Sequence, residues 1–375
     1  MKKKSILLIA LILIMTASMI LVGCGDSKDS DSNSDNSANS DATSDEVVTI
    51  KVNNFMPQET PPAQGTQAAV DKLQEISGGK MVAEVYYNGT LLGFMDSWQG
   101  TGDGAVDVAI IGPAVTDSNT ILNNIFEMPT PFLPSNAVTT TDLFNELIDT
   151  EPALNEELSK ANLRWLSMMA LCDSSLHMGK GDIKTIADVK GIKIEGLGAV
   201  SSKYWEALGA TTVSLDPGDY FTSCKNGVVD GMYTHWPCVN DYGLNDALHS
   251  HTIFGTIDPE YPNGHGISSG AMGYIVNLDK WNSLTEEQQG WLQEAFRYGS
   301  TFTSEADIAS AKSGYDKAIE NGDTITVIED ADLQPWYDAA QPVIDQWIAD
   351  SEKAGFADAS QVQNTLVSLT EKYSK

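Results

Sequence analysis

The segment from Asp188 to Pro237 constrains the fold of this chain most strongly. Within it, strand-like and helix-like patterns alternate and are separated by short turns. We expect strand, helix, strand, helix and strand, in that order, at residues 191–195, 200–208, 211–215, 219–225 and 228–233. Such a run builds a parallel sheet with right-handed crossover connections.

Polar and aromatic residues end two of these strands. Glu195 ends the first strand, and Tyr233, Thr234, His235 and Trp236 end the last. In open parallel sheets, ligands bind in the crevice outside the carboxyl ends of the strands. We therefore expect these five residues to form one wall of a small-molecule site.

A second run of the same kind lies nearer the N-terminus. Its expected elements are strands at 47–52, 81–87 and 106–111, a helix at about 66–76 and a short helix that contains Trp98. The sequence Gly104-Ala105-Val106-Asp107 before its last strand resembles Gly227-Val228-Val229-Asp230 in the other run, although four-residue matches arise by chance. We therefore expect two similar α/β lobes. Phe55, Asn88 and Trp98 are the site candidates of the first lobe because they follow or flank strand ends.

The rest of the chain is expected to return to both lobes. The capping box of Thr285–Gln288 lies in one long helix, 281–321, that can brace two lobes. Further helices are expected at 140–148, 153–160, 240–248 and much of 333–373, and further strands at 163–170, 252–254, 270–277 and 324–328. We expect an α/β fold of two hinged lobes, each a mainly parallel sheet flanked by helices. Lobe I comprises 46–170 with about 265–310, and lobe II comprises about 171–264 with 311–375.

The N-terminus indicates export from the cytoplasm. Three lysines precede an apolar run at 6–21, which predicts a signal peptide over residues 1–23. Leu21-Val22-Gly23-Cys24 resembles the lipobox at which bacterial lipoproteins are cleaved and lipidated on the new N-terminal cysteine. An uncleaved membrane anchor is the alternative, and the run is at the short edge of the roughly 17–25 residues that a spanning helix needs. Residues 25–45 are rich in Ser, Asp and Asn and are expected to be a disordered tether. Either way, the globular body lies outside the cytoplasm, anchored to the membrane.

Composition and motifs favour binding over catalysis. The formal net charge of -30 makes nucleic acid an unsuitable partner, because phosphate binding needs clustered Lys and Arg. The chain has no G-x-S-x-G, H-E-x-x-H, Walker or strand-following G-x-G-x-x-G motif, so we expect neither an enzyme nor a cofactor. A His249, His251 and His265 metal site is only weakly indicated. Asp219 is better explained as a helix N-cap than as a catalytic acid.

The cysteines do not form a recognisable framework. With Cys24 assigned to lipid, Cys172, Cys224 and Cys238 remain, which is an odd number. No C-x-x-C spacing indicates a structural zinc site. We expect free buried thiols, and a single pairing between Cys224 and Cys238 stays open.

Several motifs together resemble the solute-binding proteins of tripartite ATP-independent periplasmic (TRAP) transporters, of the dicarboxylate-binding type and in lipoprotein form. These motifs are Ile183-Lys184-Thr185, Asp188-Val189-Lys190-Gly191-Ile192-Lys193-Ile194, Ala207–Ala210, Asn226–Gly231, Met128–Leu133, Leu91-Leu92-Gly93 and Gly104–Asp107. The resemblance implies a hinged two-lobe receptor that closes around one small organic solute. It further implies delivery to a membrane permease driven by an ion gradient, and we expect the receptor to be a monomer.

The resemblance also exposes a difference at the expected site. In this family an Arg normally follows the Gly-x-Lys-Ile stretch and pairs with the ligand carboxylate, whereas this chain has Glu195 there. One hypothesis is that the ligand is neutral or carries an amine that Glu195 accepts. The alternative is that Glu195 is solvated or paired and that His235 or Lys203 meets an organic acid. Trp236 can hold an alkylammonium group by a cation–π contact or can simply pack the hinge.

Two other functions share the fold. A sensor module would present the bound solute to a receptor, and a neighbouring sensor kinase gene in place of a permease gene would indicate it. An extracellular enzyme would turn over the captured ligand, whereas a binding protein would form a stable stoichiometric complex.

Overall fold

The computed structural model describes residues 47–113, 120–130, 133–196, 198–255, 257, 264 and 266–374. The predicted signal peptide, Cys24 and the whole of the predicted tether lie outside these ranges. Within them, no helix is long and apolar enough to cross a membrane.

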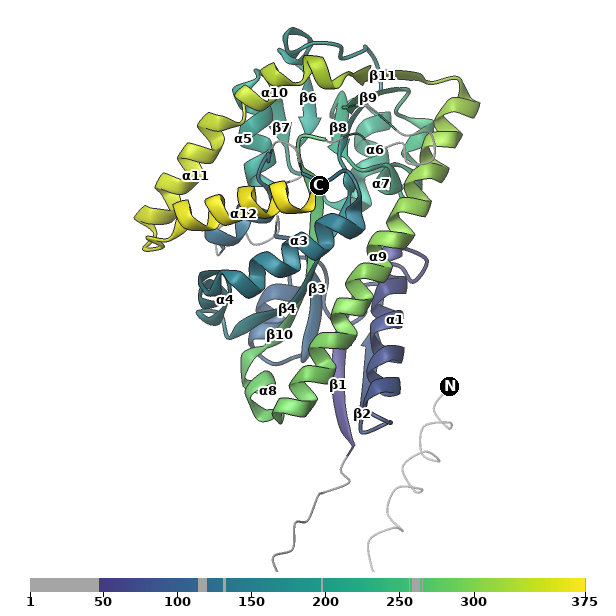
Figure 1. The fold of residues 1–375 in the computed structure, drawn as a ribbon. Helices are drawn as coiled ribbons and strands as arrows, with labels where there is room; N and C mark the ends of the chain where they lie inside the picture. Colours follow the sequence, from purple (N-terminus) through teal and green to yellow (C-terminus); the bar gives the residue numbers. More distant parts are fainter. Residues whose placement is uncertain are drawn as a thin grey trace, which may run out of the picture. The chain divides into compact units, whose positions relative to one another are not determined.

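Two sheets organise the described chain, as the sequence predicts (Figure 1). The first has the order β2 (Met81–Tyr86), β1 (Val48–Asn53), β3 (Val108–Ile111), β10 (Ser269–Asn277) and β4 (Leu163–Asp173). The second has the order β11 (Thr324–Ile328), β9 (Ser250–Phe254), β5 (Ser175–Met178), β8 (Gly231–Thr234), β6 (Lys193–Glu195) and β7 (Thr211–Val213). Strands β1, β2 and β3 are parallel, and so are β6, β7 and β8. Each predicted run therefore forms the same three-stranded parallel unit, with its first strand in the middle.

Helices connect the strands. The α-helices are α1 (Pro61–Ile76), α2 (Ser97–Gly102), α3 (Ala137–Thr150), α4 (Pro152–Ser159), α5 (Ala199–Ala207), α6 (Tyr220–Lys225), α7 (Trp236–Asp241), α8 (Leu278–Ser283), α9 (Glu286–Asn321), α10 (Gln334–Asp338), α11 (Gln341–Lys353) and α12 (Ala359–Tyr373). Short 3₁₀ helices are η2 (Leu122–Glu127), η3 (Ile186–Val189), η4 (Pro217–Asp219), η5 (Leu244–Asp246) and η6 (Asp330–Asp332).

Helix α9 spans both sheets. Its 36 residues correspond to a length of about 54 Å. It packs along α1, α3 and β4 and then along α7 and β11, as the ribbon shows (Figure 1). The predicted capping box starts it: the Thr285 side chain accepts from the backbone N–H of Gln288, and the Gln288 side chain accepts from that of Thr285. The expectation of one helix from residue 281 is wrong, because Leu284 is extended and separates α8 from α9.

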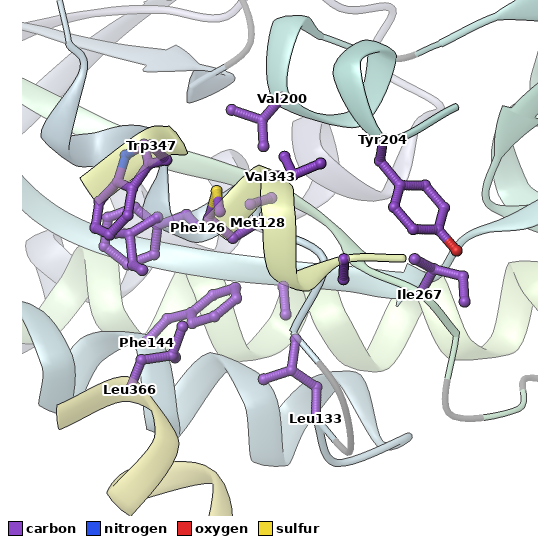
Figure 2. Close-up of a cluster of buried hydrophobic side chains, with 14 of the residues drawn as sticks. Phe126, Met128, Leu133, Phe144, Val200, Tyr204, Ile267, Val343, Trp347 and Leu366 are labelled. Atoms are coloured by element: carbon purple, nitrogen blue, oxygen red, sulfur yellow. The ribbon is translucent and has the colours of Figure 1, made fainter. Parts of the chain in front are cut away.

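An apolar cluster runs from the first sheet to the second (Figure 2). Phe126 of η2 packs edge-on against Phe144 of α3, with ring centroids 5.2 Å apart. Trp347 of α11 and Leu366 of α12 close the cluster, and the indole N–H of Trp347 donates to the carbonyl oxygen of Ile121 at 2.7 Å. The C-terminal helices therefore contact elements associated with both sheets.

The four-residue likeness between the two runs has a structural cause. Asp107 accepts a hydrogen bond from the backbone N–H of Lys51 on β1 at 2.8 Å, and Asp230 accepts one from that of Lys193 on β6 at 2.7 Å. The glycine three residues before each aspartate has a positive φ and ends a helix. Each aspartate thus fastens the entry of the third strand to the first strand of its own run.

Two expectations of the second run need correction. The strand predicted at 228–233 begins only at Gly231, because residues 227–230 form the turn that positions Asp230. The helix expected at 240–248 lies earlier, as α7, and Trp236 is its first residue. Asp219 precedes α6 but makes no capping hydrogen bond with its side chain; Asp216 instead accepts from the N–H of Gly218.

We predict that Asp107→Ala and Asp230→Ala each lower the free energy of unfolding by about 1 kcal/mol, because each removes a charged acceptor from a backbone N–H. Urea unfolding followed by circular dichroism measures this. Asp219→Ala is the matched control and should change the stability by less than about 0.5 kcal/mol. Equal stability of all three variants would show that the shared aspartate does not fasten the runs.

Candidate functional site

A cavity of about 120 Å³ lies where loops and helix ends from both sheets meet. This is close to the size of a cavity that holds one benzene-sized molecule. Its lining residues are Phe55, Met56, Pro61, Pro62, Phe94, Gly112, Glu127, Leu171, Pro217, Tyr220, Thr234, His235, Cys238, Asp241, Tyr242, Gly270, Ala271, Met272 and Asp307.

The carboxyl ends of parallel strands supply part of this lining. Phe55 follows β1, Gly112 follows β3, and Thr234 ends β8. Since β1 and β3 belong to the first sheet and β8 to the second, strand ends from both sheets face one cavity. This is the position at which open α/β sheets bind ligands.

Two aromatic pairs form apolar walls. Phe55 and Phe94 come from the first run, with ring centroids 4.7 Å apart. Tyr220 comes from the second run and Tyr242 follows α7, with ring centroids 5.2 Å apart in an edge-on arrangement. Paired aromatic rings offer both packing surface and the negative faces that attract cations.

Three carboxylates complete the lining. Asp307 of α9 and Glu127 of η2 are buried, whereas Asp241 at the end of α7 lies at the rim and is exposed to solvent. The protein around Asp241 and the nearby Asp307 carboxylate raise the pKa of Asp241 to about 6. Burial also raises the pKa of Asp307.

Asp307 joins three elements at the cavity. Its Oδ2 accepts from the backbone N–H of Cys172 near the end of β4 at 2.7 Å. Its Oδ1 accepts no hydrogen bond among the described residues and lies 3.7 Å from Nε2 of His235. Because burial lowers the pKa of His235, that imidazole is neutral at pH 7 and offers Asp307 no full counter-charge.

No Lys or Arg is among the described residues that line this cavity. The sequence contains two arginines, and both lie elsewhere: Arg164 stacks over Trp281, and Arg297 pairs with Asp149. The undescribed residues between 113 and 266 contain no Lys or Arg in their sequence. The arginine fork that suits a carboxylate ligand is therefore missing from the site.

The structure distributes the sequence-predicted site residues unequally. Phe55, Thr234 and His235 line the cavity. Asn88 is exposed in a turn and donates its backbone N–H to the carbonyl oxygen of Met56, which is a lining residue. Trp98 is buried in the apolar core and is not part of the described lining.

Tyr233 and Trp236 pack in the interior and do not line the cavity. The Tyr233 ring lies 4.8 Å from that of Trp205, and its hydroxyl accepts from the N–H of Ser268 at 3.0 Å. Trp236 is fully buried, with its ring against those of His177, His251 and Tyr315. The packing role of Trp236, which the sequence left open, is the one that its contacts support.

Glu195 is buried at the end of β6 and is not among the residues that line the cavity. Burial is the main cause that raises the pKa values of the lining residues Tyr220 and Cys238, and the Glu195 carboxylate adds to the rise. Glu195 therefore adds negative potential behind this wall. Lys203, the alternative acid-binding residue, does not line this cavity. Its Nζ lies 3.8 Å from Oδ2 of Asp350, and it lines a separate surface cavity between η2, α5 and α11.

The cysteines and histidines that the sequence singled out have structural positions. Cys172, Cys224 and Cys238 are buried thiols, and none of them forms a disulfide with another described residue, as expected. Among the described residues, no group of His, Cys, Asp and Glu is arranged to hold a metal ion, and His265 lies outside them. His249 instead contacts Asp323, with Nδ1 and Oδ1 3.1 Å apart.

Sequence reasoning missed the carboxylates and the tyrosine pair. Asp307 lies at a helical spacing shared with Phe296, Ser300, Ser304 and Ala311, all of which are buried on α9. An acidic residue on the buried stripe of a long helix was a signal that could have identified it. Glu127, Asp241 and Tyr242 carry no comparable local pattern.

The comparisons with known proteins agree with this geometry. The model of the family described as bacterial extracellular solute-binding protein, family 7, matches residues 52–350. The chain belongs to this family. It is 24% identical over 310 residues to the C4-dicarboxylate-binding protein DctB of Bacillus subtilis, covering 81% of this chain and 83% of that protein.

Solved TRAP solute-binding proteins have the same two-lobe fold. One from Rhodoferax ferrireducens, in complex with copurified benzoate, has a TM-score of 0.75 and 24% identity, covering 88% of this chain and 99% of that one. One from an unidentified marine microbe, specific for aromatic acid ligands and bound to 3-hydroxybenzoate, has a TM-score of 0.76 and 22% identity, covering 88% and 100%. The family match makes this protein a bacterial extracellular solute-binding protein, and the solved structures share its fold.

His177 and His251 pack against each other next to β8 and make the stability of the fold depend on pH. His177 Nε2 lies 3.1 Å from the carbonyl oxygen of Thr234, His177 Nδ1 lies 2.8 Å from His251 Nδ1, and His251 Nε2 lies 3.5 Å from Asp323. Two neutral imidazoles supply two N–H groups for these three contacts. Burial lowers the pKa of His251 to about 4 and that of His177 well below its usual value.

We predict that this pair destabilises the fold in acid. Both rings are neutral when folded but protonate near pH 6.5 when unfolded, so stability is lost as the pH falls from about 6.5 toward 4. For His251 alone the loss is about 3 kcal/mol. Urea unfolding at pH 7.5 and 4.5 should show a smaller pH-dependent loss in His251→Gln than in the wild type. An unchanged slope in His251→Gln would refute the assignment.

Proposed function

We propose that this protein is a membrane-anchored receptor that captures one small organic solute in the cavity between its two sheets and delivers it to a TRAP permease. The family supports solute capture outside the cytoplasm, and the cavity at the strand ends supports the place of binding. Residues 46–170 with about 265–310 and residues about 171–264 with 311–375 are proposed to be the lobes that close on the solute. We propose that it works as a monomer and without catalysis.

We propose further that the solute is neutral or carries an amine. The observation that carries this proposal is the charge of the lining, which includes Glu127, Asp241 and Asp307 but no Lys or Arg among the described residues. The two solved relatives named above are complexes with benzoate and 3-hydroxybenzoate, and such carboxylates would meet repulsion here. His235 is the one basic side chain among the described lining residues, and burial lowers its pKa.

We predict that amines or neutral solutes, and not organic acids, raise the melting temperature of the full-length protein in detergent. A solute that binds only the folded state stabilises it by mass action, by about 2.7 kcal/mol at 100 times its Kd. A thermal-shift screen of acids, amines, amino acids, sugars and nucleosides measures this. A carboxylate hit would contradict the ligand class while leaving the receptor role intact.

The same complexes distinguish the other functions. A ligand that is recovered chemically unchanged and in stoichiometric amount supports a receptor, whereas turnover would indicate an enzyme. Solute uptake that is lost without the partner permease supports transport, whereas a purely regulatory response would indicate a sensor.

We propose that Cys24 carries the lipid that anchors the receptor, because the lipobox-like sequence ends there. Cys24→Ala is expected to shift the protein from the membrane fraction, since the acyl chains supply the attachment. Fractionation and immunoblotting of cells measures the shift. Ser27→Ala, in the adjoining tether, should remain with the membrane; retention of Cys24→Ala there would instead indicate an uncleaved apolar anchor.

A further inference from the structure

The cavity contains more negative charge than a neutral solute requires. Asp307 is 1% exposed, and its carboxylate accepts hydrogen bonds from the backbone N–H and the side chain of Cys172 and lies 3.7 Å from the neutral His235. A buried carboxylate without a counter-charge is costly, because desolvation disfavours the ionised form. A cation in the cavity would supply that charge where the protein does not.

The other lining groups extend the same chemistry. Asp241 lies on the rim and Glu127 on the wall, so carboxylates reach the cavity from α7, α9 and η2. The remaining walls are largely aromatic and aliphatic, with the Phe55 and Phe94 pair from the first run and the Tyr220 and Tyr242 pair from α6 and the end of α7. Apolar walls do not stabilise an inorganic cation, whereas an organic cation buries its apolar body against them and is attracted to the ring faces.

We propose that the cavity binds a small organic cation, whose ammonium group meets Asp307, Asp241 and Glu127 while its apolar body packs between the two aromatic pairs. This inference rests on the proposed receptor function and narrows its ligand class. The cavity volume limits the apolar body to about one ring or a compact alkyl group.

The position of Asp307 connects binding to the two halves of the fold. Its carboxylate touches the end of β4, the loop after β8 and, through α9, elements packed on both sheets. A bound ammonium group at Oδ1 would therefore contact the point where these elements meet. Asp307 acts as the central anchor, and Asp241 acts as the accessible member that the cation passes at the rim.

The test compares probes of one shape and different charge. Benzylammonium, benzyl alcohol and benzoate share a ring, and choline and 3,3-dimethylbutan-1-ol share an alkyl body. Calorimetry with the full-length protein at pH 7.5 should show that at least one cation binds at least tenfold more tightly than its neutral isostere, with no binding of benzoate. Equal affinity of cation and isostere, binding of benzoate, or no binding of either cation would overturn the inference.

Variants locate the charge recognition. Asp241→Asn should weaken binding of the cation at least fivefold and leave binding of the neutral isostere unchanged. Asp307→Asn should weaken binding of the cation more than Asp241→Asn does. Because Asp307→Asn can also disturb the fold, the exposed Asp241→Asn keeps the test decisive. Asp246→Asn on η5, which does not line the cavity, is the control and should bind as the wild type does. Full cation affinity in both cavity variants would refute the assignment.

The pH dependence gives an independent readout. The titratable groups around Asp241 are Asp307, His235, Cys238 and Tyr242, with Glu127 and Tyr220 across the cavity. As the pH falls from 7.5 to 5, Asp241 becomes protonated and the affinity for a cation should fall about tenfold. Asp241→Asn should flatten this profile, and a wild-type profile that is already flat would contradict the role of Asp241.

The receptor function fails separately from this inference. If an acid or a neutral solute in the broad screen binds and these cations do not, the receptor stands and the cation assignment falls. If no solute of any class binds, both fall.

Discussion

The buried carboxylate of Asp307 is the point on which the site depends. It lies inside the molecule on α9, accepts a hydrogen bond from the end of β4 and faces His235 at the start of α7. A charge in such a position is expensive unless something compensates it. The protein provides the backbone N–H and the side chain of Cys172 and a neutral imidazole, and the two aromatic pairs and two further carboxylates surround the space next to it. The arrangement is suited to a cation that arrives from outside.

Much of the fold follows from local sequence patterns. The two strand–helix–strand runs, the capping box at Thr285 and the apolar strands were predictable, because periodicity and turn residues act over short distances. The errors lie where a tertiary contact decides the boundary. Asp230 extends the turn before β8, Leu284 interrupts the helix expected from residue 281, and α7 begins at Trp236 in place of the expected later helix.

The site was less predictable than the fold. Strand ends identified Phe55, Thr234 and His235, since those residues follow from the sheet topology alone. Asp307 lies on α9, more than 70 residues after the end of β8. Its position at the cavity depends on how α9 crosses the two sheets. Glu195 pointed to an acidic site, but it does not line the cavity. Its charge contributes to the raised pKa values of Tyr220 and Cys238, which do line it. The structure shows that neither arginine reaches the cavity, because Arg164 stacks over Trp281 and Arg297 pairs with Asp149.

The family match identifies the protein as a solute-binding protein, and the residues that line the cavity are the basis for the proposed ligand class. Two solved proteins with the same fold hold benzoate and 3-hydroxybenzoate, while this chain has carboxylates in the lining of its cavity. The most direct test is to purify the full-length receptor from its own cells, denature it and identify the released solute by mass spectrometry. The account predicts a molecule with a basic nitrogen and no free carboxylate. A released organic acid without an amine would contradict it.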